Sequence, residues 1–320
     1  MITNNLPGPG RGITPIDTQY FRPKLGACYL LEEADQAVLI DTGPGPAAPI
    51  VLKAIDEKGV SRESVVAVIV THIHLDHAGA AGELMAQLPN AKFLVHPRGA
   101  RHMAEPEKLI AGATAVYGEA EFQRLFGEVR PIDPERIVTT EDNFSFSLGE
   151  RELLFLDTPG HAKHHHCIWD EASMTAFTGD TFGISYRELD TPAGIFLFPA
   201  TTPIDFDPEA AHISIDRIAA LKPQWICPTH FGPIPFHRGL ADDLHRLLDR
   251  IRIFSRGQMR DKKTRKAKLV AGLEKIYLSR LNRLGSSLNR QQILELLAMD
   301  IEINAQGLDA WLDKMVPGGR

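Results

Sequence analysis

Cysteine is scarce in this sequence of 320 residues, which contains three: Cys28, Cys167 and Cys227. No two of them have the C-x-x-C spacing, and an odd number cannot be fully paired within one chain. The sequence therefore excludes a disulfide framework and a thiolate metal knot. It predicts three core residues in a reducing compartment.

Long apolar runs are also lacking. Val65–Val70 and Leu109–Tyr117 fall well short of the ~18 residues that a membrane span requires. The first residues, Met1–Pro23, are rich in proline and glycine and lack the basic-then-apolar pattern of a signal peptide. We therefore expect no membrane contact and a cytoplasmic protein.

Neither sign of charge predominates: 35 basic residues face 41 acidic ones, for a net charge of −6. This balance gives no overall reason to expect a nucleic-acid partner. The exception is local, because Arg256–Lys268 holds seven basic residues and one acidic residue. Such a run is typical of the solvated face of a helix, and contact with a polyanion is the alternative.

Hydrophobic periodicity divides the first half of the chain into short strands and helices. The predicted strands are Ala27–Leu31, Ala37–Ile40, Val65–Val70 and Lys92–His96. The predicted helices are Ala47–Lys58, Ala78–Leu88 and an inserted segment, Pro106–Phe126.

The second half returns to closely spaced strands and ends in helices. The predicted strands are Ile137–Thr139, Phe144–Leu148, Glu152–Asp157, His165–Asp170, Met174–Thr178 and Trp225–Pro228, with a helix at Pro208–Leu221. Two β-rich halves, each followed by helices, predict an α+β fold, a four-layer αββα sandwich. We expect a catalytic domain at residues 1–237 and a helical C-terminal extension at 238–320, packed on it or capping it.

The segment Thr71–His77 carries the strongest chemical signal, directly after the predicted strand Val65–Val70. In an extended chain, side chains alternate, so His72, His74 and Asp76 leave on one side, and a turn adds His77. Imidazole and carboxylate groups are suitable ligands for Zn²⁺, and also for iron or manganese. The alternative is a polar loop in which Asp76 caps the next helix.

Three more strand ends carry ligand-type residues: His161 after a Pro-Gly turn, Asp180 after a glycine, and His230. Each alone is typical of an ordinary turn residue. Together with Thr71–His77 they provide seven ligand-type side chains, which is enough for two metal ions. Five further histidines have no motif around them and are interpreted as structural or surface residues. They are His96, His102, His212, His237 and His245.

These motifs resemble those of the metallo-β-lactamase-fold hydrolases, and within them the glyoxalase II-like and lactonase-like dinuclear enzymes. The resemblance covers about Ala27 to Gly232, in family order. It rests on His72-x-His74-x-Asp76-His77, Thr158-Pro159-Gly160-His161, Phe177-Thr178-Gly179-Asp180-Thr181-Phe182 and Thr229-His230-Phe231-Gly232. It implies one metal ion on His72, His74 and His161, a second on Asp76, His77 and His230, and Asp180 bridging both. It also implies that Asp41, in Asp41-Thr42-Gly43, supports the ligand loops from behind.

Departures from particular subfamilies narrow the expected reaction. Flavin-linked diiron enzymes of this fold usually have glutamate at the place of His74, and zinc β-lactamases generally lack an aspartate at the place of Asp180. Glyoxalase II has glycine at the place of His164, and its glutathione-binding basic residues have no residue-by-residue match here. We also expect His165 to support a metal ligand from behind, a structural histidine being the alternative.

The resemblance thus implies a hydrolase with two divalent metal ions, zinc before iron or manganese, that cleaves a small ester, thioester or lactone through a metal-bridging hydroxide. Asp76 or Asp180 would accept the proton. No phosphate-cradling glycine loop is evident, which disfavours phosphodiesters. Two alternatives stay open: a nucleic-acid-processing phosphodiesterase that uses the basic run, and a mononuclear iron persulfide-dioxygenase-like oxidoreductase.

The expected partner is a small-molecule substrate, and a homodimer is left open. All proposed ligands lie on strand-end loops, so the pocket needs walls from elsewhere. We expect Pro106–Phe126 and the helices from Arg238 onward to provide them. Four aromatic residues are candidates to line the pocket, with a core position as the alternative: Phe182, Tyr186, Phe196 and Phe198.

Overall fold

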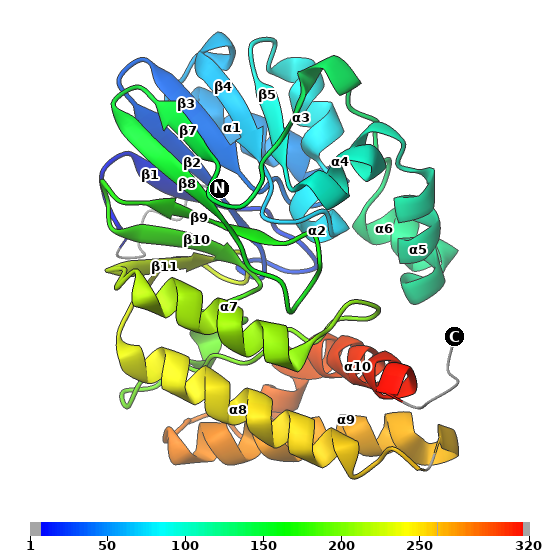
Figure 1. Cartoon of the computed structure of the whole chain (residues 1–320). Helices are drawn as coiled ribbons and strands as arrows, with labels where there is room; N and C mark the ends of the chain where they lie inside the picture. The colour runs from blue at the N-terminus through cyan, green and yellow to red at the C-terminus, as the bar shows by residue number, and fades with distance from the viewer. Residues whose placement is uncertain (1–7, 261, 316–320) are drawn as a thin grey trace. The chain divides into compact units, whose positions relative to one another are not determined.

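A computed structural model describes residues 8–260 and 262–315. They form two compact units (Figure 1). Unit 1 contains the described residues up to Asp157, together with His164–Gly179 and Lys222–Phe236. Unit 2 contains Thr158–Lys163, Asp180–Leu221 and the described residues from His237 onward.

The first sheet of unit 1 has the order β1-β2-β3-β4-β5-β6. Its strands are β1 (Ile13–Asp17), β2 (Ala27–Glu33), β3 (Gln36–Ile40), β4 (Val65–Ile69), β5 (Lys92–Val95) and β6 (Ile137–Thr139). The pairs β1/β2 and β2/β3 are antiparallel, and β3 through β6 are parallel. Strand β4 lies between two parallel neighbours and is almost wholly buried, which explains its continuous apolar sequence.

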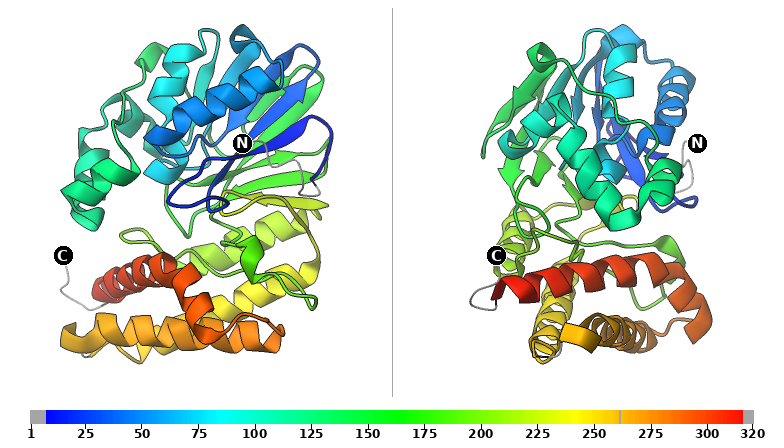
Figure 2. Two further views of the ribbon diagram at one scale, coloured as in Figure 1. Left: turned by 180° about the vertical axis from the view of Figure 1, so that it is seen from behind. Right: turned by 90° about the vertical axis from the view of Figure 1, so that its right-hand side faces the viewer.

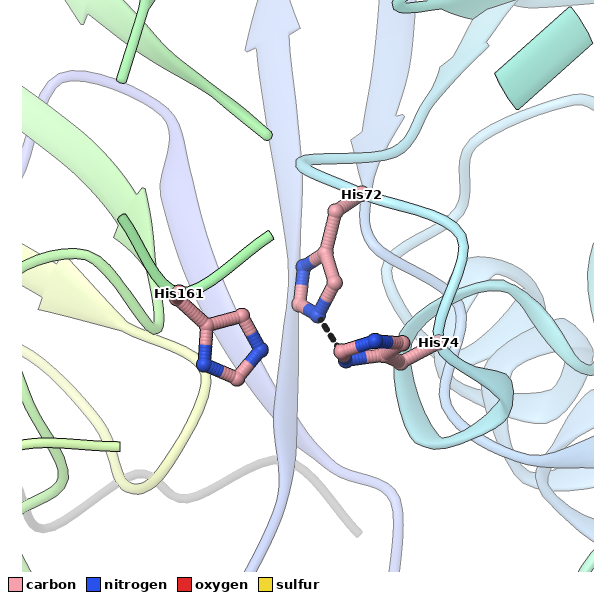
Figure 3. Close-up of side chains that lie close together, drawn as sticks. All are labelled: His72, His74 and His161. Carbon is pink, nitrogen blue, oxygen red and sulfur yellow. Dashed lines mark hydrogen bonds between the residues drawn. The ribbon is translucent and has the colours of Figure 1, made fainter. Parts of the chain in front are cut away.

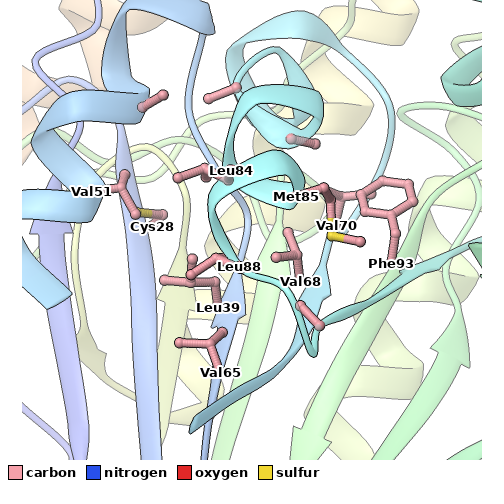
Figure 4. Close-up of a cluster of buried hydrophobic side chains, with 14 of the residues drawn as sticks. Cys28, Leu39, Val51, Val65, Val68, Val70, Leu84, Met85, Leu88 and Phe93 are labelled. Atoms are coloured by element: carbon pink, nitrogen blue, oxygen red, sulfur yellow. The ribbon is translucent and has the colours of Figure 1, made fainter. Parts of the chain in front are cut away.

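Helices cover one face of this sheet and form the core with it. The helices of unit 1 are α1 (Ala48–Glu57), α2 (Leu75–Ala78), α3 (Ala81–Gln87), α4 (Pro97–Ala104), α5 (Glu107–Tyr117) and α6 (Glu119–Leu125). Val51 of α1 and Leu84 and Met85 of α3 pack against Leu39 and Val68 of the sheet (Figure 4). This core fixes the carboxyl ends of β3 and β4, where polar residues follow.

The second sheet of unit 1 has the order β12-β11-β10-β9-β8-β7. Its strands are β7 (Ser145–Leu148), β8 (Arg151–Asp157), β9 (His166–Asp170), β10 (Thr175–Gly179), β11 (Trp225–Pro228) and β12 (Ile234–Pro235). The pair β10/β11 is parallel, and the other neighbouring pairs of this sheet are antiparallel. The long connection between them contains helix α7, as a parallel crossover requires.

Unit 2 is mainly helical. Its helices are α7 (Pro208–Ala220), α8 (Arg238–Arg256), α9 (Lys262–Arg283) and α10 (Arg290–Met315). Helix α8 packs against α7 and α9, and α10 lies along α9 (Figure 2). Phe196, Phe198 and Tyr277 form an aromatic core in this unit, with ring centroids 5.1 to 6.0 Å apart.

The predicted α+β class and the helical C-terminal region are confirmed, and each predicted strand and helix has a counterpart. Strand β1 and helix α4 were not predicted. The predicted helical insertion Pro106–Phe126 contains two helices, α5 and α6, which are separated at Gly118, whose φ is +80°. The predicted domain boundary after residue 237 stays a prediction, and the compact units group Asp180–Leu221 with the later helices.

The predictions about cysteines and membrane spans have structural counterparts. Cys28, Cys167 and Cys227, all among the described residues, are buried and form no disulfide. Burial raises the pKa of the Cys28 and Cys227 thiols well above the ordinary value. Within residues 8–260 and 262–315, no helix combines the length and the apolar character needed to cross a membrane.

Candidate metal centre

The candidate site of unit 1 lies where polar residues follow the ends of three strands. Asp41 follows β3, Thr71–His77 follows β4, and Thr229 and His230 follow β11. Strands β3 and β4 are parallel, so their carboxyl ends meet at one edge of the sheet. Ligand sites of open α/β sheets form at such edges.

The local structure of Thr71–His77 differs from the predicted extended chain. His74 is extended, with φ −62° and ψ 147°, and is the N-cap of α2. Asp76 and His77 therefore lie within the short helix α2, and Asp76 is not the N-cap. The prediction that strand alternation directs Asp76 was wrong, because the chain becomes helical at Leu75. The helical turn brings Asp76 and His77 to the site instead.

The ligand atoms of Asp76, His77 and His230 all lie within 4.8 Å of one another. The Nε2 atom of His230 is 3.2 Å from Asp76 Oδ2, and that of His77 is 3.7 Å from the same oxygen. His72 and His74 lie beside this group, with 2.8 Å between His72 Nε2 and His74 Nδ1 (Figure 3). The rings of His72 and His77 are 4.0 Å apart. Unit 1 thus brings together five predicted ligands.

Hydrogen bonds determine which nitrogen of each ring can bind a metal. His77 Nδ1–H donates to Asp41 Oδ2 at 3.0 Å. His230 Nδ1–H donates to the carbonyl oxygen of Leu25 at 2.9 Å. Since a neutral imidazole carries one N–H, Nε2 of both rings has the lone pair. Both Nε2 lone pairs are on the side of Asp76. A proton on Nδ1 and a lone pair on Nε2 are the tautomer that metal binding at Nε2 requires.

Asp41 organises the loops behind these ligands, as the family resemblance implies. Its carboxylate accepts hydrogen bonds from Thr71 N (2.7 Å), Thr229 Oγ1 (2.6 Å) and His77. It therefore joins the segments after β3, β4 and β11. Its φ of +56° is unusual for a residue other than glycine and is maintained by these bonds. The sequence motifs gave no signal for the role of Thr71 and Thr229.

The three consecutive histidines after residue 163 have different surroundings. The His165 ring is completely buried and packs against the His72 ring, with centroids 4.8 Å apart. The His164 ring lies 5.4 Å from that of His74. His166 faces away from these ligands: its Nε2–H donates to Val70 O at 2.7 Å, and its Nδ1 accepts from Thr140 Oγ1. Burial lowers the pKa of His166 to about 3.

Unit 2 contains the other two predicted ligands, His161 and Asp180. His161 Nε2 lies 3.4 Å from Asp180 Oδ2. His161 Nδ1–H donates to Ala200 O at 3.1 Å, which leaves the lone pair on Nε2. Both side chains are at least 95% buried. The same tautomer thus occurs here as at His77 and His230.

The predicted pocket residues are instead core residues of unit 2. Phe182, Tyr186, Phe196 and Phe198 are at most 1% exposed. Tyr186 donates a hydrogen bond to Asp300 at 2.9 Å. At this burial the four rings take the core position that was the alternative to lining a pocket. Phe196 and Phe198 pack against Tyr277 of α9, and Tyr186 bonds to α10.

Three residues of the basic run form ion pairs with acidic residues of α10. Arg265 is 1% exposed, which excludes it from a solvated surface. The pairs are Lys262 with Asp313, Arg265 with Asp309 and Asp313, and Lys266 with Glu302. This part of the run neutralises α10, so it offers less positive charge to a polyanion than its composition indicates.

Comparison with known proteins gives the family. The sequence profile described as Metallo-beta-lactamase superfamily matches residues 22–230. A metallo-beta-lactamase fold-containing protein of Sulfurisphaera tokodaii is 29% identical over 169 residues, which cover 52% of this chain and 60% of that protein. A hydroxyacylglutathione hydrolase of an Enterobacter species is 30% identical over 152 residues, which cover 48% of this chain and 45% of that enzyme.

The matched regions thus span about half the length of these curated relatives. A solved structure of an archaeal metallo-beta-lactamase superfamily protein from Sulfolobus tokodaii has a TM-score of 0.65 and 23% identity. The match covers 93% of this chain and 98% of that chain, and it shows the predicted fold. The family profile and the fold agree with the motifs, and the chain belongs to the metallo-beta-lactamase superfamily.

Proposed function

We propose that this protein is a dinuclear metal-dependent hydrolase of a small ester, thioester or lactone. One observation carries the proposal: the Nε2 lone pairs of His77 and His230 are directed to the side of Asp76 Oδ2 by hydrogen bonds from Nδ1 to Asp41 and Leu25. Nitrogen and carboxylate donors without thiolates suit Zn²⁺, and also iron or manganese. A solvated polar loop would not require these tautomers.

Chain connectivity supports adding Asp180 to this ligand set. Asp180 is bonded to Gly179, the last residue of β10. A Cβ atom at Gly179 would lie 2.5 Å from Thr71 Oγ1 and 2.6 Å from His165 Nε2. The peptide before Asp180 is therefore held against the segment that carries His72, which supports Asp180 as a member of the same ligand set.

Connectivity also supports His161 as a ligand. His161 lies in the connection Thr158–Lys163, which is bounded on both sides by unit 1. Three peptide units separate it from His164, and they span at most about 10 Å. The His164 ring lies 5.4 Å from that of His74. We assign His72, His74 and His161 to one ion, and Asp76, His77 and His230 to the other.

The proposed chemistry divides between the metals and the chain. Two bound divalent ions would lower the pKa of a water molecule to near neutrality and polarise a substrate carbonyl. Asp76 or Asp180 would accept the proton of the attacking water and deliver it to the leaving group. Asp41 keeps His77 in the required tautomer throughout. The similarity to a hydroxyacylglutathione hydrolase supports a thioester among the candidate substrates.

Ring contacts support the insertion of unit 1 as a wall of the proposed pocket. The Tyr20 ring lies 6.4 Å from that of His230 and 6.1 Å from that of Phe126. Phe126 in turn contacts Tyr117 at the end of α5. Helix α5 has no fully buried residue, and its apolar side chains Leu109, Ile110 and Val116 are partly exposed. We propose that α5 and α6 select the acyl group.

Elemental analysis of unchelated protein, with hydrolysis assays on ester, thioester, lactone and phosphodiester substrates, tests the proposal. We expect about two metal ions per chain at the candidate centre and hydrolysis of a carbonyl substrate. Asp180→Ala should reduce metal content and activity, whereas Asp35→Ala, at an exposed position, should change neither. A metal content that stays at or below one after incubation with excess zinc would exclude the dinuclear assignment.

A further inference from the structure

Two histidines of unit 2 face each other outside the candidate metal centre. His212 is on α7 and His245 is on α8. Their Nδ1 atoms are 2.6 Å apart, whereas the ring centroids are 4.9 Å apart and the ring planes differ by 13°. Because the nitrogens are much closer than the centroids and the planes are nearly parallel, the rings meet edge to edge with Nδ1 facing Nδ1.

The opposite nitrogen of each ring faces a carboxylate. His245 Nε2 is 3.2 Å from Asp216 Oδ1, and His212 Nε2 is 3.4 Å from Asp249 Oδ1. The arrangement is reciprocal, since each helix supplies one histidine and, four residues later, the carboxylate that faces the histidine of the other helix. A carboxylate at Nε2 favours a proton on that nitrogen.

Arginine residues hold these carboxylates in place. Arg238 Nη2 is 3.1 Å from Asp216, and Arg252 Nη2 is 3.0 Å from Asp249. With protons on both Nε2 atoms, the lone pairs of both Nδ1 atoms are directed into the same gap. Two nitrogens at 2.6 Å with facing lone pairs repel each other unless a proton or a metal ion lies between them.

We propose that His212 and His245 bind a divalent transition-metal ion such as Zn²⁺ through their Nδ1 atoms. Each half of the pair repeats the carboxylate–histidine arrangement of Asp41 and His77. The side chains are 20% and 18% exposed, which admits the ion and the water molecules that complete its coordination. Tetrahedral coordination at the usual Zn–N distance requires the nitrogens to separate by about 0.7 Å, which a small rotation of these partly exposed rings allows. The proposal does not depend on the proposed function.

Calorimetric titration of the full chain with Zn²⁺ tests this site. Wild type should bind one more equivalent than His212→Asn or His245→Asn. His237→Asn, which replaces an exposed histidine of the same unit, should retain the wild-type stoichiometry. Asp216→Asn keeps both ligands, and we expect it to weaken the additional binding step about tenfold. Crystals soaked in Zn²⁺ should show anomalous scattering between the two Nδ1 atoms.

Equal stoichiometry in wild type and both histidine variants, with no anomalous peak, would overturn the proposal. His212 and His245 would then be joined only by a hydrogen bond between their Nδ1 atoms. Thermal unfolding in the presence of EDTA shows whether each variant is folded. Asp180→Ala separates this proposal from the proposed function. If the additional step persists in that variant, the site on α7 and α8 is independent of the candidate centre. If it disappears there and persists in His212→Asn, the assignment to this pair is wrong.

Discussion

The side chain of Asn304 on α10 accepts a hydrogen bond from the backbone amide of Thr201 at 2.7 Å. Its amide group also donates to Pro199 O at 3.1 Å. Between these two residues is Ala200, whose carbonyl oxygen accepts the hydrogen bond from His161 Nδ1. Helix α10 therefore orients a proposed metal ligand through a three-residue backbone segment.

We expect Asn304→Ala to weaken metal binding about tenfold, because it frees the backbone that fixes the His161 tautomer. The free energy of unfolding should also fall by about 1–3 kcal/mol, since two buried backbone groups lose their partner. Competition with a chelator measures the affinity, and urea denaturation measures the stability. Gln306→Ala, two residues along α10, is the matched control. An unchanged affinity in Asn304→Ala would show that α10 has only a structural role.

Gly179→Ala should reduce both stability and metal content. The φ of Gly179 is +47°, and a Cβ would approach Thr71 Oγ1 and His165 Nε2 to within 2.6 Å. Gly59 has a φ of +73° and open space around it, so Gly59→Ala measures the cost of the left-handed backbone alone, about 1 kcal/mol. Gly179→Ala should cost at least about 2 kcal/mol more, because buried atoms must move. Equal losses in the two variants would contradict the close approach.

Asp41→Asn should lower metal affinity by about 10- to 100-fold, because the amide can no longer accept from every donor around it. Its carboxylate is 1% exposed and accepts from Thr71, His77 and Thr229. The free energy of unfolding should fall by about 2–4 kcal/mol. Chelator competition and urea denaturation provide the measurements, with Asp35→Asn as the exposed control. Wild-type affinity in Asp41→Asn would rule out the proposed support of His77.

Acidification should destabilise the protein through His166. Burial lowers its pKa to about 3, whereas an unfolded histidine takes up a proton near pH 6.5. Between these values the unfolded state binds more protons, so the free energy of unfolding decreases as the pH falls, by up to ~1.4 kcal/mol per pH unit. His166→Gln should flatten this dependence relative to wild type and to His237→Gln. Identical slopes in all three proteins would mean that His166 titrates normally in the folded state.

Local sequence patterns were sufficient to predict an element where its signal lies within a few residues. The apolar run Val65–Val70 predicted β4, and apolar residues three and four apart, such as Leu240, Leu244 and Leu247, are typical of the buried face of α8. Strand β1 was missed because Pro15 cannot donate a hydrogen bond, and only pairing at the sheet edge with β2 makes this segment a strand. Helix α4 was missed although Pro97 stands at its first turn, where proline is favoured.

The types and order of the proposed ligands could be predicted from the sequence, since each lies in a loop or turn that follows a strand specified by its own apolar residues. Which nitrogen of each imidazole is available depends on tertiary contacts, because Asp41 reaches His77 across 36 residues and Ala200 reaches His161 across 39. The same is true of His212 and His245, which are 33 residues apart, have no motif around them and face each other. Such contacts depend on how helices and strand ends pack, and packing is set by the whole core and not by neighbours along the chain.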